Sequence, residues 1–322
     1  MSPDRTVAVV VPSWNSAGLL PPCLASLEGQ EIELETMVVD NGSTDGTLAY
    51  LEREGVAHVS LPRNTGFAAA VNLGAARVGA DAILVLNADT VLEPGAIARL
   101  REALDADGSL GGVQPRILQL EGEPADRDVA TAHLYSAGQA LTRDGRALEV
   151  GAGEPQGEAY LRHREVFGVC GAACLLRREL FDQLGGYDKR YFAFYEDVDL
   201  NVRARIAGWG FAYVPEAVVW HVGNASWQAG FAKPGAENAR LVARNRFATQ
   251  AKFMPARALP RIAAVEAGSL VRAASQRRLW ATLRGKLSVV PWLPALLGER
   301  RRLRREGDPG RARRWLGAEE TV

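Results

Sequence analysis

The chain has 322 residues, of which 47% are hydrophobic and 24% charged, so it is long enough for one large domain or two smaller ones with a full core. Its three cysteines (Cys23, Cys170 and Cys174) exclude a disulfide framework and a four-ligand zinc set, and we expect buried thiols. No secretion signal and no apolar run long enough to span a bilayer can be recognised, so we expect a cytoplasmic protein. The net charge is zero, but residues 240–322 carry 19 Lys and Arg against 6 Asp and Glu, which predicts a basic C-terminal region with a partner of its own.

Short apolar, β-branched segments alternate with helical segments through the first hundred residues. The expected strands cover residues 7–12, 36–40, 57–61 and 82–86, and the expected helices cover residues 19–27, 47–53 and 67–78. This alternation predicts β-α-β units and a parallel sheet covered by helices, which is an α/β fold. Ligands bind beyond the carboxyl ends of such strands, so the polar residues that follow each strand are the candidates for a site.

The pattern changes after a helix expected at residues 93–104. The following elements are expected in chain order: a strand at 111–120, a loop-rich acidic stretch at 121–165, a strand at 166–176, a helix at 178–184, a helix ending near Gly208, two short strands within 211–221, and Arg-rich helices from about 240. These elements extend the α/β pattern into a second half and end it with a helical region.

The segment "LVLNADT" places Asn87 and Asp89 where an apolar strand stops. One interpretation is turn chemistry, since Asx side chains bond nearby backbone and cap helices. The other is a metal and diphosphate site, since two alternate oxygen-bearing side chains can converge on one hard cation. Both interpretations stay open on these residues alone.

A second strand end, "VVDNGSTDG", finishes in Asp40. Ordinary turn and capping chemistry explains the Asn41-Gly42 turn that comes next, but not a carboxylate as the last strand residue, which fits a nucleotide contact. No G-x-G-x-x-G follows the first strand and no P-loop motif occurs, so a dinucleotide oxidoreductase and a P-loop NTPase are disfavoured.

The segment "YEDVDL" places Glu196, Asp197 and Asp199 at a loop-to-helix junction. Favourable charge at a helix N-terminus is one explanation, and Asp199 also has the spacing of an ordinary surface pair with Arg203. Glu196 and Asp197 point about 100° apart on a helix, so one of them can face a pocket as a general base. His221 directly follows an apolar strand, where a packed histidine and a ligand are both open interpretations.

The motifs "VPSWN", "VVDNGSTDG", "RNTGFAAAVN", "LNADT", "ACLLRRELFDQLGGYD", "FYEDVDLNVRARIAGWG" and "VVWH" together resemble the family 2 glycosyltransferases, most of all the bacterial rhamnosyltransferase-like members. The resemblance covers residues 5–225 and keeps the order and spacing of the motifs. It implies a GT-A fold, a nucleotide-diphosphate sugar donor, a divalent cation (Mg²⁺ or Mn²⁺) and inversion at the anomeric carbon.

The resemblance also implies roles for individual residues. They are a donor-side first loop with Pro12 and Asn15, a nucleotide-base contact at Asp40, a donor-binding turn with Arg63, Asn64 and Gly66, the D-x-D positions at Asn87 and Asp89, a catalytic base at Asp197, and a late metal ligand at His221. Asn87 stands where the first Asp of D-x-D is usual, so the protein alone should hold a hard cation more weakly.

These residues define a mechanism. We expect a cation held by Asp89, with Asn87 and His221, to stabilise the departing diphosphate, and we expect Asp197, with Glu196 as its positional alternative, to remove the proton of the attacking hydroxyl. One base facing one leaving group gives a single displacement and therefore inversion. A sugar-nucleotide nucleotidyltransferase and an inactive carbohydrate-binding relative are the competing functions.

The division of the chain follows the same resemblance. We expect a catalytic domain at residues 1–239, with a nucleotide-sugar half at 1–105 and an acceptor half at 106–239, and a basic helical extension at 240–322. For the extension we weigh a solvated charged surface, an anionic membrane surface on the inner face of the cell membrane, and a homodimer contact; no nucleic-acid module accompanies its charge. The expected acceptor is a glycan or a polyprenyl-linked sugar of a cell-surface polysaccharide, and the expected sugar is rhamnose.

Overall fold

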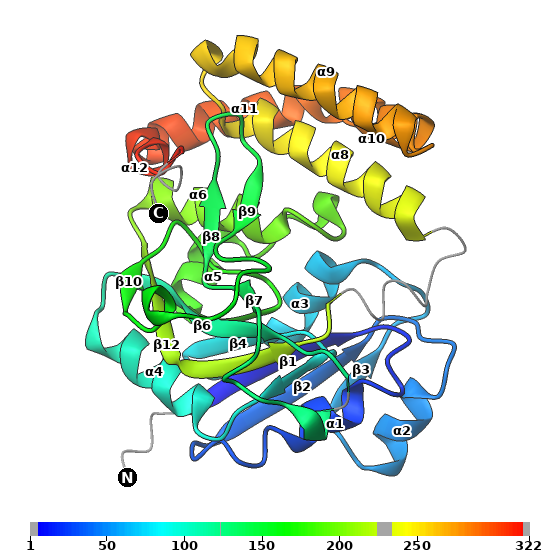
Figure 1. Ribbon diagram of the computed structural model, residues 1–322, viewed down its shortest axis with the longest axis vertical. Helices are drawn as coiled ribbons and strands as arrows, with labels where there is room; N and C mark the ends of the chain where they lie inside the picture. The colour runs from blue at the N-terminus through cyan, green and yellow to red at the C-terminus, as the bar shows by residue number, and fades with distance from the viewer. Residues whose placement is uncertain (1–5, 123, 224–233, 318–322) are drawn as a thin grey trace.

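A mixed ten-stranded sheet forms the centre of the protein in the computed structural model, which describes residues 6–122, 124–223 and 234–317 (Figure 1). The strands run in the order β10-β12-β6-β11-β4-β1-β2-β3, with β5 paired to β12 and β7 to β6. Their bounds are β1 Val7–Ser13, β2 Leu34–Asp40, β3 His58–Ser60, β4 Ala82–Leu86, β5 Thr90–Leu92, β6 Leu110–Gln119, β7 Leu134–Ser136, β10 Arg164–Glu165, β11 Ala173–Arg177 and β12 Gly210–His221.

The first half of the sheet is parallel, as its alternating pattern predicts. Strands β1, β2, β3 and β4 pair in parallel, with α1 (Leu20–Ala25), α2 (Thr47–Arg53) and α3 (Phe67–Ala75) in the connections. Helix α3 lies close against the sheet because Gly74 has no side chain: a Cβ there would lie 2.5 Å from Val10 Cγ1. The carboxyl ends of β1, β2 and β4 therefore meet along one edge of the sheet.

The second half departs from the prediction in two places. The strand expected at 166–176 begins only at Ala173, because the main chain before it bonds irregularly: the Val166 N–H donates to the Phe211 carbonyl and the Cys170 N–H to Gln114 Oε1. The two strands expected within 211–221 are one strand, β12, which continues past a shift in register between Val214 and Val218. Pro215 lies in that irregularity, where the strand needs no ladder hydrogen bond from the N–H that proline lacks.

The stretch expected to be loop-rich contains a small hairpin of β8 (Gln139–Leu141) and β9 (Ala147–Glu149), together with β7. Strands of three residues are too short to show a hydrophobic period, which explains why the pattern does not reveal them. Figure 1 shows this hairpin rising from the sheet toward the C-terminal helices.

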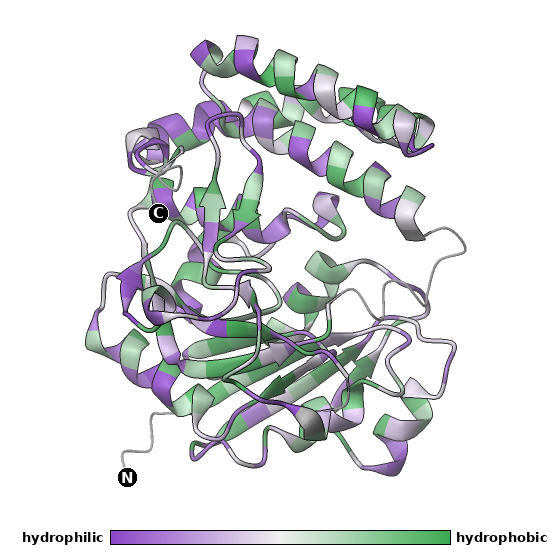
Figure 2. Ribbon diagram, viewed as in Figure 1, coloured by the Kyte–Doolittle hydropathy of each residue, from purple (hydrophilic) through white to green (hydrophobic). Residues whose placement is uncertain are grey.

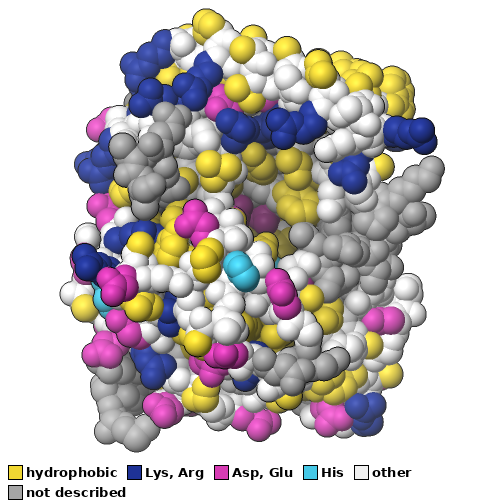
Figure 3. Space-filling model, in the orientation of Figure 1, with side chains coloured by type: hydrophobic (Ala, Val, Ile, Leu, Met, Phe, Trp, Pro, Cys, Tyr) yellow, Lys and Arg dark blue, Asp and Glu magenta, His cyan; other side chains and the backbone are white. Residues whose placement is uncertain are grey.

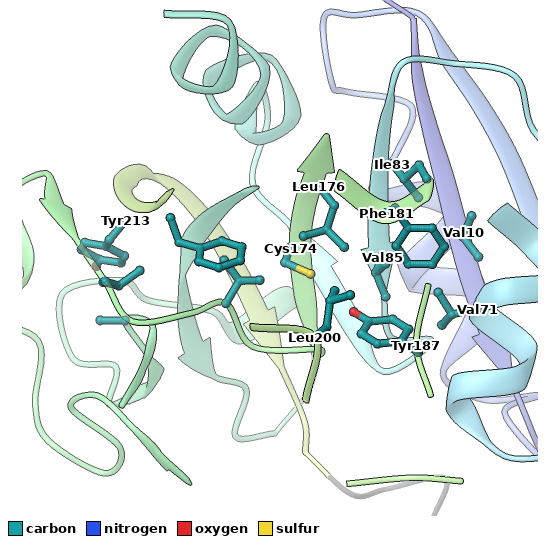
Figure 4. Close-up of a cluster of buried hydrophobic side chains, with 14 of the residues drawn as sticks. Val10, Val71, Ile83, Val85, Cys174, Leu176, Phe181, Tyr187, Leu200 and Tyr213 are labelled. Atoms are coloured by element: carbon teal, nitrogen blue, oxygen red, sulfur yellow. The ribbon is translucent and has the colours of Figure 1, made fainter. Parts of the chain in front are cut away.

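Buried apolar side chains fill both faces of the sheet, and the strands accordingly stand out as hydrophobic in Figure 2. On one face, Val10, Val85 and Leu176 pack with residues of α3, of α5 (Arg178–Leu184) and of α6 (Glu196–Ala207), as Figure 4 shows. The other face packs against α1 and α4 (Ala96–Ala106). All three cysteines are buried and free, which confirms the expected buried thiols.

The C-terminal helices form a layer above α5, α6 and the β8–β9 hairpin (Figure 1). They are α8 Pro234–Phe253, α9 Leu259–Ser275, α10 Leu279–Leu287, α11 Leu293–Glu306 and α12 Pro309–Arg313, with 3₁₀ turns η4 Ala256–Ala258 and η5 Val290–Trp292 between them. The boundary that we placed between residues 239 and 240 falls inside α8. Within the described residues, no helix is both long enough and apolar enough to cross a bilayer.

Buried charge and apolar contacts fasten this layer to α6. Asp199 does pair with Arg203, but the pair is buried and not on the surface as expected. Lys252 of α8 also lies 2.7 Å from Asp199 Oδ1. Val202 of α6 packs with Met254 and Leu303 in the same region. The basic C-terminal helices thus share a core with the helix that carries Glu196 and Asp197.

Candidate active site

A cavity of about 320 Å³ opens at the carboxyl edge of the sheet, between the strand ends and the C-terminal helices. Figure 3 shows a hollow near the middle of this face, below the Lys and Arg side chains of the upper helices. Eight of the predicted site residues line the cavity: Pro12, Asn64, Gly66, Asn87, Asp89, Glu196, Asp197 and His221. Segments far apart in the sequence therefore meet in one cavity.

Asn87, Asp89 and His221 lie in direct contact on one wall of this cavity. His221 Nε2 lies 3.0 Å from Asp89 Oδ1 and 3.3 Å from Asn87 Nδ2. The pairing of β5 with β12 sets His221 opposite Thr90 and so brings the end of β12 to the turn after β4. Asp89 is 6% exposed and His221 is 2% exposed, so both side chains are almost dry apart from their cavity-facing atoms.

This group has the chemistry of a cation site. A carboxylate, an amide and an imidazole are donors that Mg²⁺ or Mn²⁺ accepts. His221 Nδ1 has no hydrogen-bond partner among the described residues, so no other group fixes the ring tautomer through that nitrogen. The edge of the Tyr135 ring packs against the imidazole at a centroid distance of 4.4 Å and limits its movement. The donor set therefore fits a divalent cation.

The acidic pair begins helix α6 on the other side of the cavity. Asp197 Oδ2 accepts hydrogen bonds from Gln139 Nε2 at 2.7 Å and from the Gly171 N–H at 3.0 Å, while Oδ1 accepts one from the Val198 N–H at 2.8 Å. Burial raises the pKa of the Asp197 carboxyl in spite of these three donors. Asp197 is thus held in one orientation and is a better proton acceptor than an ordinary aspartate.

Glu196 differs from its neighbour in having fewer partners. It is 5% exposed, and its Oε2 has no hydrogen-bond partner among the described residues. Burial, and then the nearby charge of Asp197, raise the pKa of the Glu196 carboxyl well above its usual range. Because the Glu196 and Asp197 carboxyls disfavour each other's ionisation, we expect one of them to be protonated while the other is ionised.

A third carboxyl, Glu149 on β9, was missed by the sequence reasoning. Its Oε2 accepts a hydrogen bond from Ser136 Oγ at 2.6 Å and its Oε1 one from Gln139 Nε2 at 3.0 Å, so Gln139 bridges Glu149 and Asp197. The ligand atoms of Glu149, Cys170 and Asp197 all lie within 4.8 Å of one another. Burial, and then the charge of Asp197, raise the pKa of Glu149 to about 7. A glutamate in a three-residue strand carries no motif that could have identified it.

Asn41, one of the polar residues that follow the strands and one that turn chemistry alone could explain, lines the cavity. Its Nδ2 donates to Asn64 Oδ1 at 3.1 Å and to the Gly66 carbonyl at 3.2 Å, and its Oδ1 accepts from the Thr65 N–H at 2.8 Å. Gly66 itself has a φ of +91°, and a Cβ there would lie 2.6 Å from the Phe192 ring. Asn41 therefore fixes the turn at residues 64–66 that the sequence singled out.

Three predicted nucleotide contacts lie outside the cavity lining. Asp40 is 2% exposed and its Oδ1 accepts the Ser43 N–H at 3.3 Å. Asn15 bonds to the same turn, accepting the Thr44 N–H at 2.8 Å. The side chain of Arg63 is exposed. Their assignment to the nucleotide stays a prediction.

The sequence profile described as Glycosyl transferase family 2 matches residues 8–185. The chain belongs to glycosyltransferase family 2. This family 2 glycosyltransferase is 32% identical over 238 residues to the N-acetylglucosaminyl-diphospho-decaprenol L-rhamnosyltransferase of Mycobacterium tuberculosis, an alignment that covers 66% of this chain and 75% of the relative. It is also 28% identical over 234 residues to an N-acetylglucosaminyltransferase of Mesorhizobium japonicum, covering 67% of this chain and 51% of that one.

Solved structures agree on the fold of this glycosyltransferase. A mannosyltransferase from Pyrobaculum calidifontis, in complex with GDP-Man and Mn²⁺, matches with a TM-score of 0.52 at 18% identity, covering 97% of this chain and 86% of that one. GalNAc-T7 with UDP, GalNAc and Mn²⁺ matches with a TM-score of 0.56 at 17% identity, covering 78% of this chain and 51% of that one. The predicted GT-A fold is confirmed, and the family membership decides for a glycosyltransferase over a nucleotidyltransferase.

Proposed function

We propose that this glycosyltransferase moves a sugar from a nucleotide-diphosphate donor to a hydroxyl of a polyprenyl-linked glycan, with inversion, in the synthesis of a bacterial cell-surface polysaccharide. The observation that carries the proposal is that the Asn87, Asp89 and His221 group and the Glu196–Asp197 pair line one cavity. Rhamnose is the first candidate sugar because the mycobacterial relative is named a rhamnosyltransferase with a decaprenol-linked acceptor.

Asn87, Asp89 and His221 would bind the diphosphate of the donor through a cation. Asp89, Asn87 and His221 would hold Mg²⁺ or Mn²⁺, and such an ion would offset the negative charge that the diphosphate gains as it leaves. Asn87 contributes a neutral amide where a carboxylate is usual, so affinity for the cation should depend on the diphosphate being present. The turn at residues 64–66, with Asn41 and Pro12, would bind the donor beside this group, and Asp40, Asn15 and Arg63 would meet the nucleotide beyond the cavity.

The acidic pair is assigned to the acceptor. Asp197, fixed by three hydrogen bonds, would take the proton of the attacking hydroxyl, a role worth about 10²- to 10⁴-fold in rate. Glu196 stays the alternative base because its Oε2 has no partner among the described residues. Glu149 and Gln139 adjoin Asp197 and would bind other hydroxyls of the acceptor.

The test is a transfer assay on the purified protein with UDP-, GDP- and dTDP-sugars, Mn²⁺ and a lipid-diphosphate-linked N-acetylglucosamine. We expect transfer from one donor class, loss of transfer on addition of a chelator, and at least a hundredfold loss of turnover in Asp197→Asn with donor affinity nearly unchanged. Glu196→Gln is the matched variant that assigns the base. Wild-type turnover in Asp197→Asn would remove that residue from the mechanism.

The C-terminal helices carry features of a membrane-binding face, which would bring the enzyme to a polyprenyl-linked acceptor at the inner face of the cell membrane. Seven large hydrophobic side chains are exposed on this layer: Leu259, Val271, Leu279, Trp280, Leu287, Val290 and Leu297. Figure 3 shows hydrophobic and basic side chains side by side along this part of the surface. Apolar side chains mixed with arginines suit an anionic lipid headgroup layer.

Co-sedimentation with phosphatidylglycerol vesicles tests this face, with phosphatidylcholine vesicles as the neutral control. We expect binding to the anionic vesicles alone and its loss in the paired variant Trp280→Ser, Leu287→Ser, both of which are more than half exposed in the wild type. Equal partitioning of wild type and variant would contradict the membrane proposal. A homodimer is the alternative occupant of this face, and light scattering without lipid would reveal it.

A further inference from the structure

The segment that leads into Glu196 and Asp197 has an unusual main-chain conformation. Phe192, Phe194 and Tyr195 all have left-handed φ angles, at +65°, +69° and +69°. Such angles are uncommon for any residue but glycine and are unfavourable for bulky side chains. Each of these three residues also lines the cavity. A loop of this shape persists only where its surroundings hold it.

Helix α8 supplies the holding contacts. The Asn245 side chain is fully buried, and its Nδ2 lies 2.8 Å from the Tyr191 carbonyl, 2.8 Å from the Ala193 carbonyl and 2.6 Å from the Phe194 carbonyl. Two amide hydrogens are therefore shared among three carbonyl oxygens of one turn of the loop. The Asn245 Oδ1 in turn accepts a hydrogen bond from Arg244 Nε at 2.9 Å. The orientation of the amide is thus fixed, with its nitrogen toward the loop.

Arg244 reinforces the same contact and connects it to the rest of the C-terminal layer. Its Nη2 donates to the Tyr191 carbonyl at 2.7 Å, and its guanidinium stacks over the Trp292 ring at 5.1 Å from the centroid. Contacts of the loop with other parts of the chain include a main-chain bond from the Ala68 N–H to the Phe192 carbonyl at 3.2 Å and a bond from the Ala147 N–H to the Tyr195 hydroxyl at 3.4 Å. Asn245 accordingly holds the carbonyls of Ala193 and Phe194, which come just before Tyr195 and the start of α6.

We propose that Asn245 is a positioning residue of the glycosyltransferase, which fixes the loop of residues 191–195 so that the carboxyls of Glu196 and Asp197 face the cavity. This inference rests on the proposed function, in which one of those carboxyls is the base. It gives the C-terminal helices a part in catalysis that is separate from any contact with lipid. Displacement of a catalytic group by about 1 Å is enough to cost about 10²-fold in rate.

The experiment compares Asn245→Ala with a matched control, Arg178→Ala. Arg178 also donates to three main-chain carbonyls, those of Ala75, Val78 and Ala80, but at the end of the sheet where β4 begins, away from the cavity. Turnover, acceptor KM and donor affinity are measured for both variants, together with hydrogen exchange of the amides at residues 191–199. For Asn245→Ala we expect kcat to fall about 10- to 100-fold, donor affinity to stay within twofold, and exchange at 191–199 to accelerate.

Arg178→Ala should lose stability but keep kcat and the exchange of residues 191–199. If Asn245→Ala does not fold, Asn245→Ser keeps one donor and should give an intermediate loss of kcat. Equal kcat values for the Asn245 and Arg178 variants, with unchanged exchange at 191–199, would overturn the positioning role. Hydrogen exchange needs no substrate, so it also separates this proposal from the proposed function. If the wild type transfers no sugar but Asn245→Ala still exchanges faster at residues 191–199, the proposed function is overturned and the role of Asn245 in the loop is supported.

Discussion

Replacing Lys252 with methionine tests how firmly the C-terminal layer is joined to helix α6, which carries Glu196 and Asp197. The Lys252 side chain is 2% exposed, and its Nζ lies 2.7 Å from Asp199 Oδ1 and 2.9 Å from Glu299 Oε2. Methionine keeps most of the volume and removes the charge. Removal of one partner from a buried ion pair costs about 3–5 kcal/mol, because the remaining charge is left without compensation.

The expected loss lies at the lower end of that range, about 3 kcal/mol, because both acids keep a second partner. Asp199 keeps Arg203 at 2.6 Å, and Glu299 is 26% exposed and keeps Arg190. The assay is urea unfolding at pH 7, with Arg53→Met as the control, since Arg53 and Glu54 form a pair whose side chains are 68% and 47% exposed. The control should cost under about 1 kcal/mol. Equal midpoints for the two variants would refute the reasoning.

The ionisation of Asp199 sets how the difference in stability between wild type and Lys252→Met depends on pH. Burial opposes its ionisation, but the charges of Lys252 and Arg203 hold the pKa of the Asp199 carboxyl below its ordinary value. A lowered pKa in the folded state gives a stabilisation that is complete above the unfolded value of about 3.9 and is lost as the pH falls through the folded value. Wild type and Lys252→Met should therefore differ fully at pH 7 and converge below about pH 4.

Two further predictions concern the cavity. Asp89→Ala should lose the Mn²⁺-dependent part of nucleoside diphosphate binding, about 10-fold or more by calorimetry with and without the metal, and an unchanged affinity would count against the cation site. Glu149→Gln removes a carboxyl that ionises near pH 7 beside Asp197, so any change in kcat/KM that follows this ionisation should disappear in the variant; a step near pH 7 that persists in Glu149→Gln would show that Glu149 does not cause it. The pKa of Glu149 is raised to about 7 in the folded protein from about 4.3 in an unfolded chain, so wild type loses stability as the pH rises between these values; the variant should gain stability relative to wild type over that range and keep the gain above pH 7.

The parallel half of the fold could be predicted because its signals are local. Val7, Val9 and Val11 alternate with other apolar residues in a strand buried on both faces, and turn residues come directly after each such strand. The carboxyl-edge rule then placed Asn64, Asn87 and Asp89 near one another without any knowledge of distances. Two local signals predict this part of the site: the apolar strands and the polar residues at their carboxyl ends.

The rest of the site depends on contacts between distant segments. Glu149 reaches Asp197 only because the β8–β9 hairpin folds back, and neither three-residue strand carries a periodic signal. Asn245 is one polar residue among many on a helix, and its contacts with residues 191–194 cross more than fifty positions of sequence. The strand-end signal also does not say which of two neighbouring residues lines the cavity: Asn41 lines it, whereas Asp40 lies outside the lining and its nucleotide contact stays a prediction.

Helix α8 carries Val242 into the cavity lining while it continues without a break through residues 239 and 240. Part of the cavity lining therefore comes from the same helical layer that displays the exposed tryptophan and leucine side chains. In this family 2 enzyme, exchanging the C-terminal helices for those of another member would alter the shape of the cavity as well as the surface around it. A change in this one layer therefore reaches the cavity and the outer surface together.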